Sequence, residues 1–344
     1  MKTYRFTLRP LSAFGTPLAG DTLFGQLCWT LRHQLGNARL NELLHGYTSG
    51  QPFAVLSDAL PTGHVPLPHV PSELWQKSSA ADAPDRKALK KRKWLPGTTL
   101  ATPFASWQAN AHSDAEVADP LINAWASQGK HRDPKGSSHT ERAQPHNSIN
   151  RQTGTTGDGQ FAPYAMPQIW FHPAMQFDLV VVLDEARLSL TELTAALDYI
   201  GKTGFGRDAS IGLGKFELLG DAVLSSLRGE GAAPTRGSAN SYLTLGPCAP
   251  QGLGFCPVRS SYQVATRFGR HGDAAVQSGQ PFKRPVLLAK AGGVFWPETL
   301  DASRQFIGQG LGGIANPVST AMPETVQQGY APVIAIARPV EKAA

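Results

Sequence analysis

Residues 201–219 read GKTGFGRDASIGLGKFELL, a glycine-rich stretch that joins a helical pattern to a strand pattern. Just before it, residues 189–200 place apolar side chains at helical spacing: Leu190, Leu193, Leu197 and Ile200. Such a stripe predicts a helix with one face against a core. The stretch ends in an apolar run that predicts a strand at about 213–219. The sequence therefore predicts a helix, a glycine-rich loop and a strand in succession.

Upstream of this stretch, four segments carry the periodicities of further elements. They predict a strand at 3–9, a helix at 21–35, a strand at 53–56 and two strand-like runs within 168–186. Asp21 is the expected N-cap of the first helix, and the two runs should turn at His172–Pro173 as a hairpin. The complete order is strand, helix, strand, hairpin, helix, strand. This order fits a ferredoxin-like domain with a large insertion.

The insertion, at about 57–160, shows little periodicity. From 109 to 160 it is polar, rich in Gly, Ser, His and Asn, and too long for a simple connection. Loops of this length are usually functional or flexible. The expected domain plan is an N-terminal domain at 1–220, a linker at 221–240 and a β-rich C-terminal domain at 241–344. Strands of the C-terminal domain are expected near 241–245, 258–268, 284–296 and 330–338.

The composition is that of a globular protein, because 41% of the 344 residues are hydrophobic and 17% are charged. A formal net charge of +6 suits a polyanionic partner without requiring one. Three cysteines with no CxxC pair argue against a disulfide framework and favour a reducing, cytoplasmic location. No apolar run approaches the length of a membrane span, and the N-terminus lacks a signal-peptide core, so no membrane partner is expected.

The glycine-rich stretch also predicts an anion-binding loop. Glycines let backbone N–H groups approach a phosphate closely, and the Lys and Arg side chains between them add charge-assisted contacts. The residues expected to contact RNA here are Lys202, Gly204, Gly206, Arg207, Ser210, Gly212, Gly214 and Lys215. A glycine-rich turn with solvated lysines is the alternative. A P-loop is excluded because Ala196 stands where its first glycine is required, and a dinucleotide fingerprint fits poorly because the stretch follows a helix.

Two further segments carry groups that suit nucleic acid. RKALKKRK at 86–93 is strongly basic and is followed by Trp94, as in a phosphate track that ends with one stacked base. HNSINRQTGTTGDG at 146–159 supplies amides, an arginine and hydroxyls for phosphates, 2′-OH groups and base edges. The candidate contacts are Lys90, Lys91, Arg92, Lys93, Asn147, Asn150 and Arg151. A solvated helix face and a polar surface loop are the respective alternatives.

The histidines do not indicate a metal site. His64 and His69 are five residues apart, but no cysteine or carboxylate pair completes a zinc site. His131, His139 and His146 lie in the insertion, where a histidine would be the general base if the chain were a ribonuclease. No lysine, tyrosine or second histidine is placed to complete that set. The expectation is a protein without catalytic residues, metal or cofactor, and a small-molecule enzyme that uses the glycine-rich loop is a further alternative.

Three segments taken together resemble a known family. KKRKWLP (90–96), NSINRQTGTT (147–156) and GKTGFGRDASIGLGKFE (201–217) occur in that order. KRPVLLAKAGGVF (283–295) and GYAPVIAIARPV (329–340) follow toward the C-terminus. The chain resembles the repeat-associated mysterious protein superfamily of CRISPR systems. Within it, the chain is most similar to the subunit that caps the guide RNA 5′ handle in type III-A (Csm) complexes.

That resemblance implies an α+β fold of two ferredoxin-like, RNA-recognition-motif-like domains with long insertions and glycine-rich loops. It implies a non-catalytic, RNA-binding role in antiviral defence. The implied partners are the CRISPR guide RNA, the large polymerase-like subunit and the backbone repeat subunit. Related superfamily members cleave precursor CRISPR RNA, so an endoribonuclease is the alternative. The insertion at 109–146 departs from the family pattern, and the sequence assigns it no role.

Overall fold

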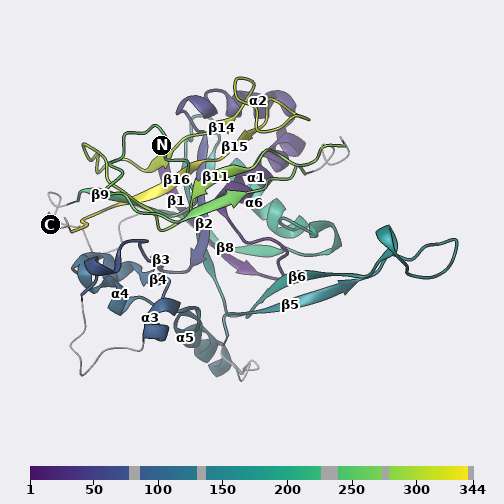
Figure 1. The fold of residues 1–344 in the computed structure, drawn as a ribbon, viewed down its shortest axis with the longest axis horizontal. Helices are drawn as coiled ribbons and strands as arrows, with labels where there is room; N and C mark the ends of the chain where they lie inside the picture. Colours follow the sequence, from purple (N-terminus) through teal and green to yellow (C-terminus); the bar gives the residue numbers. More distant parts are fainter. Residues whose placement is uncertain (77–85, 130–136, 226–238, 273–278, 340–344) are drawn as a thin grey trace.

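A four-stranded antiparallel sheet lies at the centre of the N-terminal half of the computed structural model, which describes residues 1–76, 86–129, 137–225, 239–272 and 279–339 (Figure 1). Its strands lie in the order β2-β7-β1-β8. Their bounds are β1 (Lys2–Pro10), β2 (Ala54–Pro61), β7 (Phe177–Leu183) and β8 (Phe216–Leu224). Helix α1 (Gly20–Leu35) joins β1 to β2, and α6 (Leu190–Thr203) joins β7 to β8. The sequence predicted this β-α-β-β-α-β succession with one strand more, because it counted a hairpin of two strands before α6, and the second of these, β7, belongs to this sheet.

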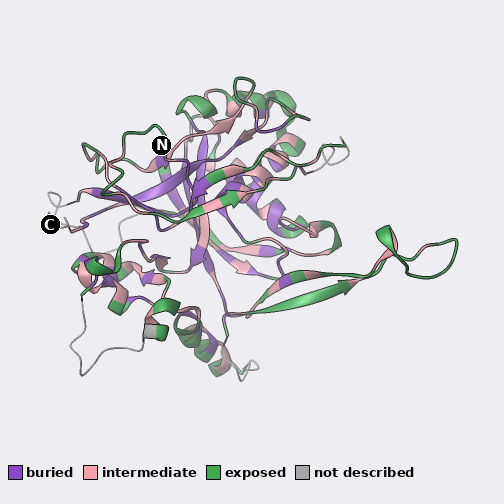
Figure 2. Ribbon diagram, in the orientation of Figure 1, coloured by how far each residue is buried: buried purple, intermediate pink, exposed green. Residues whose placement is uncertain are grey.

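The main core lies between this sheet and the two helices. The leucine stripe of α1 and the apolar stripe of α6 are buried in one cluster with the inward side chains of β1. Every residue of β7 is buried, which its continuous apolar run explains. Full burial of one such aliphatic side chain contributes about 1.5–3 kcal/mol to folding. Figure 2 shows this pattern as purple central strands with greener outer helix faces.

The two helices begin in different ways. Ser189 caps α6 through a capping box, in which the Glu192 backbone N–H donates to Ser189 Oγ over 3.2 Å. The expectation that Asp21 caps α1 is wrong. Ala19 is the N-cap, and Asp21 lies inside the first turn, where its carboxylate is 3.1 Å from Arg267 Nε. Because this first turn is buried against the C-terminal half, the Asp21 carboxylate pairs with Arg267 and does not cap the helix.

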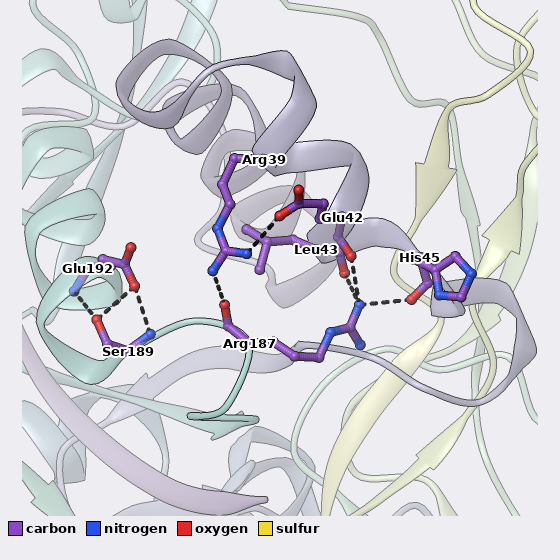
Figure 3. A network of polar contacts seen from close by, with 7 residues as sticks. All are labelled: Arg39, Glu42, Leu43, His45, Arg187, Ser189 and Glu192. Atoms are coloured by element: carbon purple, nitrogen blue, oxygen red, sulfur yellow. Dashed lines mark hydrogen bonds and ion pairs between the residues drawn. The ribbon is translucent and has the colours of Figure 1, made fainter.

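Arg187 closes the C-terminal end of α2 (Asn37–Leu44), the short helix after α1 (Figure 3). Its Nη2 donates to the backbone carbonyls of Leu43 and of His45, the second over 2.8 Å. Arg39 donates in turn to the carbonyl of Arg187 over 2.5 Å and pairs with Glu42. The last carbonyls of a helix have no partner within it, so these bonds fasten α2 to the segment before α6.

The two strand-like runs around His172–Pro173 are both strands, but they do not form a hairpin. β6 (Tyr164–Phe171) pairs with β5 (His139–His146), while β7 pairs with β1 and β2. The reason is burial, since β7 is apolar throughout and belongs inside the sheet, whereas most of β5 and β6 is solvent-accessible. The ribbon β5–β6 and its connecting loop, residues 139–171, form an arm that projects from the body (Figure 1).

The described residues of the insertion have a core of their own, although residues 57–160 show little periodicity in the sequence. The insertion contains β3 (His64–Pro66), α3 (Arg86–Lys91), β4 (Trp94–Pro96), α4 (Trp107–Asn110) and α5 (Asp114–Ser127). The rings of Trp75 and Phe104 stack with centroids 5.2 Å apart, and Trp107 packs beside them. Ser113 and Glu116 form a capping box at the start of α5. The insertion is thus a small helical layer against the sheet.

The described C-terminal residues form a second antiparallel sheet in the order β12-β9-β16-β13. Its strands are β9 (Ser241–Thr244), β12 (Val294–Phe295), β13 (Phe306–Gly308) and β16 (Tyr330–Ile336). Two ribbons flank it: β10 (Val264–Arg267) with β11 (Val286–Ala289), and β14 (Leu311–Gly312) with β15 (Val326–Gln327). Residues 239–272 and 279–339 contain no α-helix, so a second ferredoxin-like domain stays a prediction. The mixture of helices and strands confirms the α+β class.

The two halves share their interior. Tyr330 of β16 belongs to the main core, and its hydroxyl donates to the Tyr47 carbonyl over 2.6 Å. β8 continues to Leu224, into the segment expected to be a linker, and 226–238 lies outside the described residues. Among the described residues, no helix combines the length and the apolar character that a membrane span requires.

Candidate RNA interface

The glycine-rich loop folds back on itself. The Phe205 N–H donates to the Gly214 carbonyl over 3.0 Å, and the Gly214 N–H donates to the Ala13 carbonyl over 2.7 Å. A Cβ at Gly214 would lie 2.1 Å from the Phe205 carbonyl oxygen, and one at Gly204 would lie 2.4 Å from that of Leu213. Gly204 and Gly214 are buried. Their lack of a side chain therefore serves the folding of the loop itself.

The outer side of the loop is open to solvent. Gly212 has a positive φ of 102° and nothing within 4 Å of an added Cβ. Ser210 and Lys215 are exposed beside it. Lys202 is exposed at the end of α6 and pairs with Asp198 over 2.6 Å. These residues are the part of the loop that a phosphate backbone can reach.

Arg207 points from the loop to the base of the arm. Its backbone N–H donates to Thr16 Oγ1 over 3.0 Å, and its Nη2 donates to the Pro167 carbonyl of β6 over 2.5 Å. Gly206 packs on the same threonine, because an added Cβ would lie 2.7 Å from Thr16 Cβ. These bonds hold the loop against the arm. Arg207 therefore positions the loop in addition to contributing a positive charge.

The predicted polar loop lies at the far end of the arm. Asn150 closes a tight turn there: its N–H donates to the Thr155 carbonyl over 3.0 Å, and its carbonyl accepts from Gly154 over 2.8 Å. Asn147 and Arg151 are exposed on the same loop. The structure therefore separates this group from the glycine-rich loop along the arm (Figure 1).

The basic run divides into two parts. Lys93 Nζ lies 2.6 Å from Asp114 Oδ2, and Trp94 Nε1 donates to the other oxygen over 2.7 Å. Burial raises the pKa of Asp114, but these two hydrogen bonds outweigh it and hold that pKa below its ordinary value. Arg92 donates to the Gln108 carbonyl over 3.3 Å. Arg92 and Lys93 thus fasten β4 to α4 and α5, while Lys90 and Lys91 are exposed.

A groove of about 690 Å³ separates the insertion from the main body, and we call it the insertion groove. Five cationic side chains and two carboxylates line it: Lys90, Arg92, Lys93, Arg267, Lys290, Asp58 and Asp114. Apolar residues form much of the remaining wall, among them Leu18, Leu67, Phe171 and Met175. This excess of positive charge over an apolar wall suits a nucleotide backbone with a base beside it.

Asp58 and Arg267 line the insertion groove, and Arg267 pairs with Asp21 behind it. Burial raises the pKa of Asp58 to about 7, against one hydrogen bond from the Gly20 N–H to Oδ1 over 2.8 Å. Asp21 adds to this rise as a second negative charge. Sequence reasoning missed Arg267, Lys290 and Asp58, because they come from segments far apart in the chain and carry no local pattern.

The glycine-rich loop and the insertion groove lie on the same strand of the arm. Arg207 binds the carbonyl of Pro167, while Ile169 and Phe171 of that strand line the groove. The Phe14 N–H donates to the Ile169 carbonyl over 2.8 Å and holds the base of the arm to the segment after β1. The glycine-rich loop and the insertion groove are thus both linked to β6, and together they are the candidate interface.

Two histidines of the insertion lie together, a pairing that the sequence did not predict. His64 Nε2 is 3.1 Å from His112 Nδ1, and His64 Nδ1 donates to the Thr62 carbonyl over 2.9 Å. Burial lowers the pKa of His64, so its ring is neutral at pH 7. His139 contacts Ser138 Oγ over 2.9 Å, whereas the earlier candidate His131 lies outside the described residues. The described residues contain no cluster of ligands for a metal ion.

The fold and this interface define an α+β protein with a ferredoxin-like N-terminal sheet and a basic face at the base of a projecting arm. No protein-family model matches the sequence, and no curated protein matches it. Solved structures do match it over nearly its whole length.

One similar chain belongs to the "Csm3-Csm4 subcomplex in the type III-A CRISPR-Cas interference complex", with 14% identity, a TM-score of 0.58, and coverage of 97% of this chain and 99% of that chain. Another belongs to the "Csm1-Csm4 cassette in complex with pppApA", with 13% identity, a TM-score of 0.55, and coverage of 98% and 99%. A third, the "Csm1-Csm4 cassette in complex with AMPPNP", has 13% identity, a TM-score of 0.56 and the same coverage. Csm4 is the component common to all three. The expected resemblance to this subunit is confirmed at the level of the fold.

Proposed function

We propose that this chain is a Csm4-like, non-catalytic subunit of a type III CRISPR effector complex. In this role it holds the repeat-derived 5′ handle of the guide RNA and joins the large polymerase-like subunit to the first backbone repeat subunit. The observation that carries the proposal is the fold match, which spans 97% of this chain and 99% of a chain in a Csm3-Csm4 structure. The complex would work in the cytoplasm, where guide RNA is present.

The interface supports the RNA part of the proposal. Exposed Lys202 and Lys215 belong to the glycine-rich stretch, and exposed Lys90 and Lys290 line the insertion groove. Cations spaced along a surface contact successive phosphates and position a strand without reading its sequence. The apolar wall of the insertion groove offers room for a base beside that backbone. An RNA strand crossing the base of the arm would satisfy both sets of contacts.

The ribbon β10–β11 supports the protein part of the proposal. Four apolar side chains in this ribbon or next to it are more than half exposed: Val264, Phe268, Phe282 and Leu287. Apolar patches of this kind mark protein interaction sites on soluble proteins. A protein subunit of the same complex is the partner that the proposal assigns to this surface.

The test of the RNA part measures binding of a fluorescent 5′-handle RNA to the purified chain as a function of salt. The variant Lys90→Ala/Lys290→Ala should bind less tightly, with a salt slope smaller by about two, because each lost phosphate contact reduces the slope by about one. Lys2→Ala is the matched control, since Lys2 pairs with Glu185 at the start of β1, outside the interface. Equal affinity and slope in all three proteins would contradict the proposal.

The same RNA tests the endoribonuclease alternative, for which the His64–His112 pair is the specific candidate. We expect repeat RNA to stay intact during incubation with the chain, with and without divalent metal. Specific cleavage that disappears in His64→Ala would overturn the non-catalytic assignment. It would leave the RNA-binding assignment standing.

A further inference from the structure

A second cavity lies beside α1 and α2, and we call it the α1–α2 pocket. It has a volume of about 470 Å³ and is lined by α1, α2 and loops of the C-terminal half. The residues that matter here are Trp29, Arg32, His271, Lys283 and Glu324. None of its lining residues lines the insertion groove, so the two sites are separate. Its volume is within the range of small-molecule sites, about 300–1,000 Å³.

Lys283 is the unusual residue of the pocket. Its side chain packs over Gly269, where an added Cβ would lie 3.0 Å from Lys283 Cδ. Within the described part of the chain, its ammonium has no ion pair with a carboxylate. Burial lowers the pKa of Lys283, and the nearby Cys28 and Asp21 side chains oppose this lowering. A half-buried ammonium that forms no direct ion pair is stabilised by a bound anion.

The indole of Trp29 supplies a flat aromatic ring to the wall of the pocket. The Arg32 guanidinium carbon lies 5.0 Å from the centroid of the Trp29 indole. Gly272 lies against this ring, because an added Cβ would be 3.5 Å from Trp29 Nε1. The indole N–H has no hydrogen-bond partner within the described ranges, and it remains available to a ligand. A planar, polar-edged ring is the kind of group that this wall recognises.

The ionisable side chains of the pocket include one histidine with a hydrogen-bond partner and one buried thiol. His271 Nε2 is 2.6 Å from Ser319 Oγ, and burial followed by the charge of Lys283 lowers the His271 pKa, while Glu324 opposes this. The imidazole is therefore neutral at pH 7. Burial raises the pKa of the Cys28 thiol to about 12, so it too is neutral. Among the described lining residues, Arg32, Lys283 and the carboxylate of Glu324 also border the pocket.

We propose that the α1–α2 pocket binds a nucleotide, with a phosphate group at Lys283 and the base on the wall formed by Trp29. This function goes beyond the handle-binding role, because it uses a different cavity. A free mononucleotide and the end nucleotide of an RNA strand carry the same chemistry. The experiment below separates these two sources.

Isothermal titration of the purified full chain with AMP tests the proposal. We expect AMP to bind, inorganic phosphate and adenosine to bind at least tenfold more weakly, and Lys283→Met to weaken AMP binding at least tenfold. Arg284→Met is the matched control, because it removes a neighbouring exposed cation that does not line the pocket. Trp29→Phe keeps a ring but removes the N–H donor, and it should weaken AMP binding less than Lys283→Met. Thermal unfolding of each variant confirms that it is folded.

Two competitors identify the source of the nucleotide. A short RNA with a 5′-phosphate displaces AMP if the pocket takes a strand end, whereas a circular RNA of the same sequence does not. Displacement by neither identifies a free nucleotide as the ligand. The proposal is overturned if AMP does not bind, if Lys283→Met binds it as well as the unaltered chain, or if phosphate alone binds as tightly as AMP. Handle binding is measured separately in Lys283→Met and should be unchanged, so failure here is distinguishable from failure of the RNA-binding role.

Discussion

Arg207 Nη2 donates a hydrogen bond to the backbone carbonyl of Pro167 over 2.5 Å, and this bond joins the glycine-rich loop to the arm. The two residues are 40 positions apart in the sequence and belong to different elements. Within the described residues, β5 pairs with β6 and with no other strand, so the orientation of the arm depends on contacts at its base. Arg207, which was expected to bind RNA, therefore also positions the arm.

Replacement of Arg207 by alanine should therefore loosen the arm. Loss of a hydrogen bond from a charged donor costs about 1.5–3 kcal/mol, and the unpaired Pro167 carbonyl is left without its partner. Hydrogen exchange should accelerate across 139–171 while the central sheet keeps its protection. Arg207→Lys keeps the charge but lacks the planar guanidinium, so it should not restore the protection. Unchanged exchange in the arm of both variants would show that Arg207 does not position it.

Removal of the two exposed lysines of the loop should weaken RNA binding and leave the stability of the fold unchanged. Lys202→Ala/Lys215→Ala should weaken handle binding by roughly 1–3 kcal/mol and reduce the salt slope by about two, because two phosphate contacts are lost. The unfolding midpoint should hardly move, since both side chains are exposed and the Lys202–Asp198 pair is a surface pair. Fluorescence anisotropy at several salt concentrations measures the slope. An unaltered slope would remove the loop from the RNA interface.

Two glycines of the loop should respond differently to alanine. At Gly214 the added Cβ would lie 2.1 Å from the Phe205 carbonyl oxygen, whereas at Gly212 it would meet nothing within 4 Å. Both have positive φ, which costs of order 1–3 kcal/mol for a residue with a side chain. Gly212→Ala should show this cost alone, and Gly214→Ala should lose clearly more stability in urea unfolding. Equal losses would mean that the backbone contact at Gly214 relaxes freely.

Asp58 should make the protein less stable as the pH rises. Burial raises its folded-state pKa to about 7, so the folded state binds a proton more tightly than the unfolded state does. The stabilisation is present below the unfolded pKa, near 4, and is lost as the pH rises through about 7. Its size is about 4 kcal/mol at most, since each pKa unit corresponds to 1.36 kcal/mol. Asp58→Asn should flatten the fall in urea stability between pH 4 and pH 8, and an identical fall in the variant would assign it to other groups.

Much of the N-terminal fold follows from sequence, because its elements carry strong local periodicity. The leucine stripes of α1 and α6 and the alternation in β1 predicted these elements within a few residues of their ends. The strand pairing of β6 did not follow, since periodicity shows that a segment is a strand but not which strand lies beside it. The helix α5 was detectable, because Ser113 and Glu116 form a capping-box pattern before an apolar stripe.

Less of the candidate site could be predicted from the sequence. The glycine-rich loop was found from its composition, yet the roles of Gly204 and Gly214 depend on contacts with Leu213 and Phe205 that no spacing rule describes. The insertion groove brings Lys90 beside Arg267 and Lys290, which are separated by a large part of the chain. Such convergence is a property of the tertiary fold. Local sequence patterns predict the elements, but the packing between them decides which charges meet.

The most direct test of the central claim is co-purification of the tagged chain from cells that express a type III guide RNA, its large polymerase-like subunit and its backbone subunit. Sequencing of the bound RNA and mapping of its ultraviolet crosslinks form one measurement. The account predicts both protein partners, uncut RNA with uniform repeat-derived 5′ ends, and crosslinks at the base of the arm and in the insertion groove. Recovery of the chain without guide RNA, or with RNA of random 5′ ends crosslinked elsewhere, would contradict it.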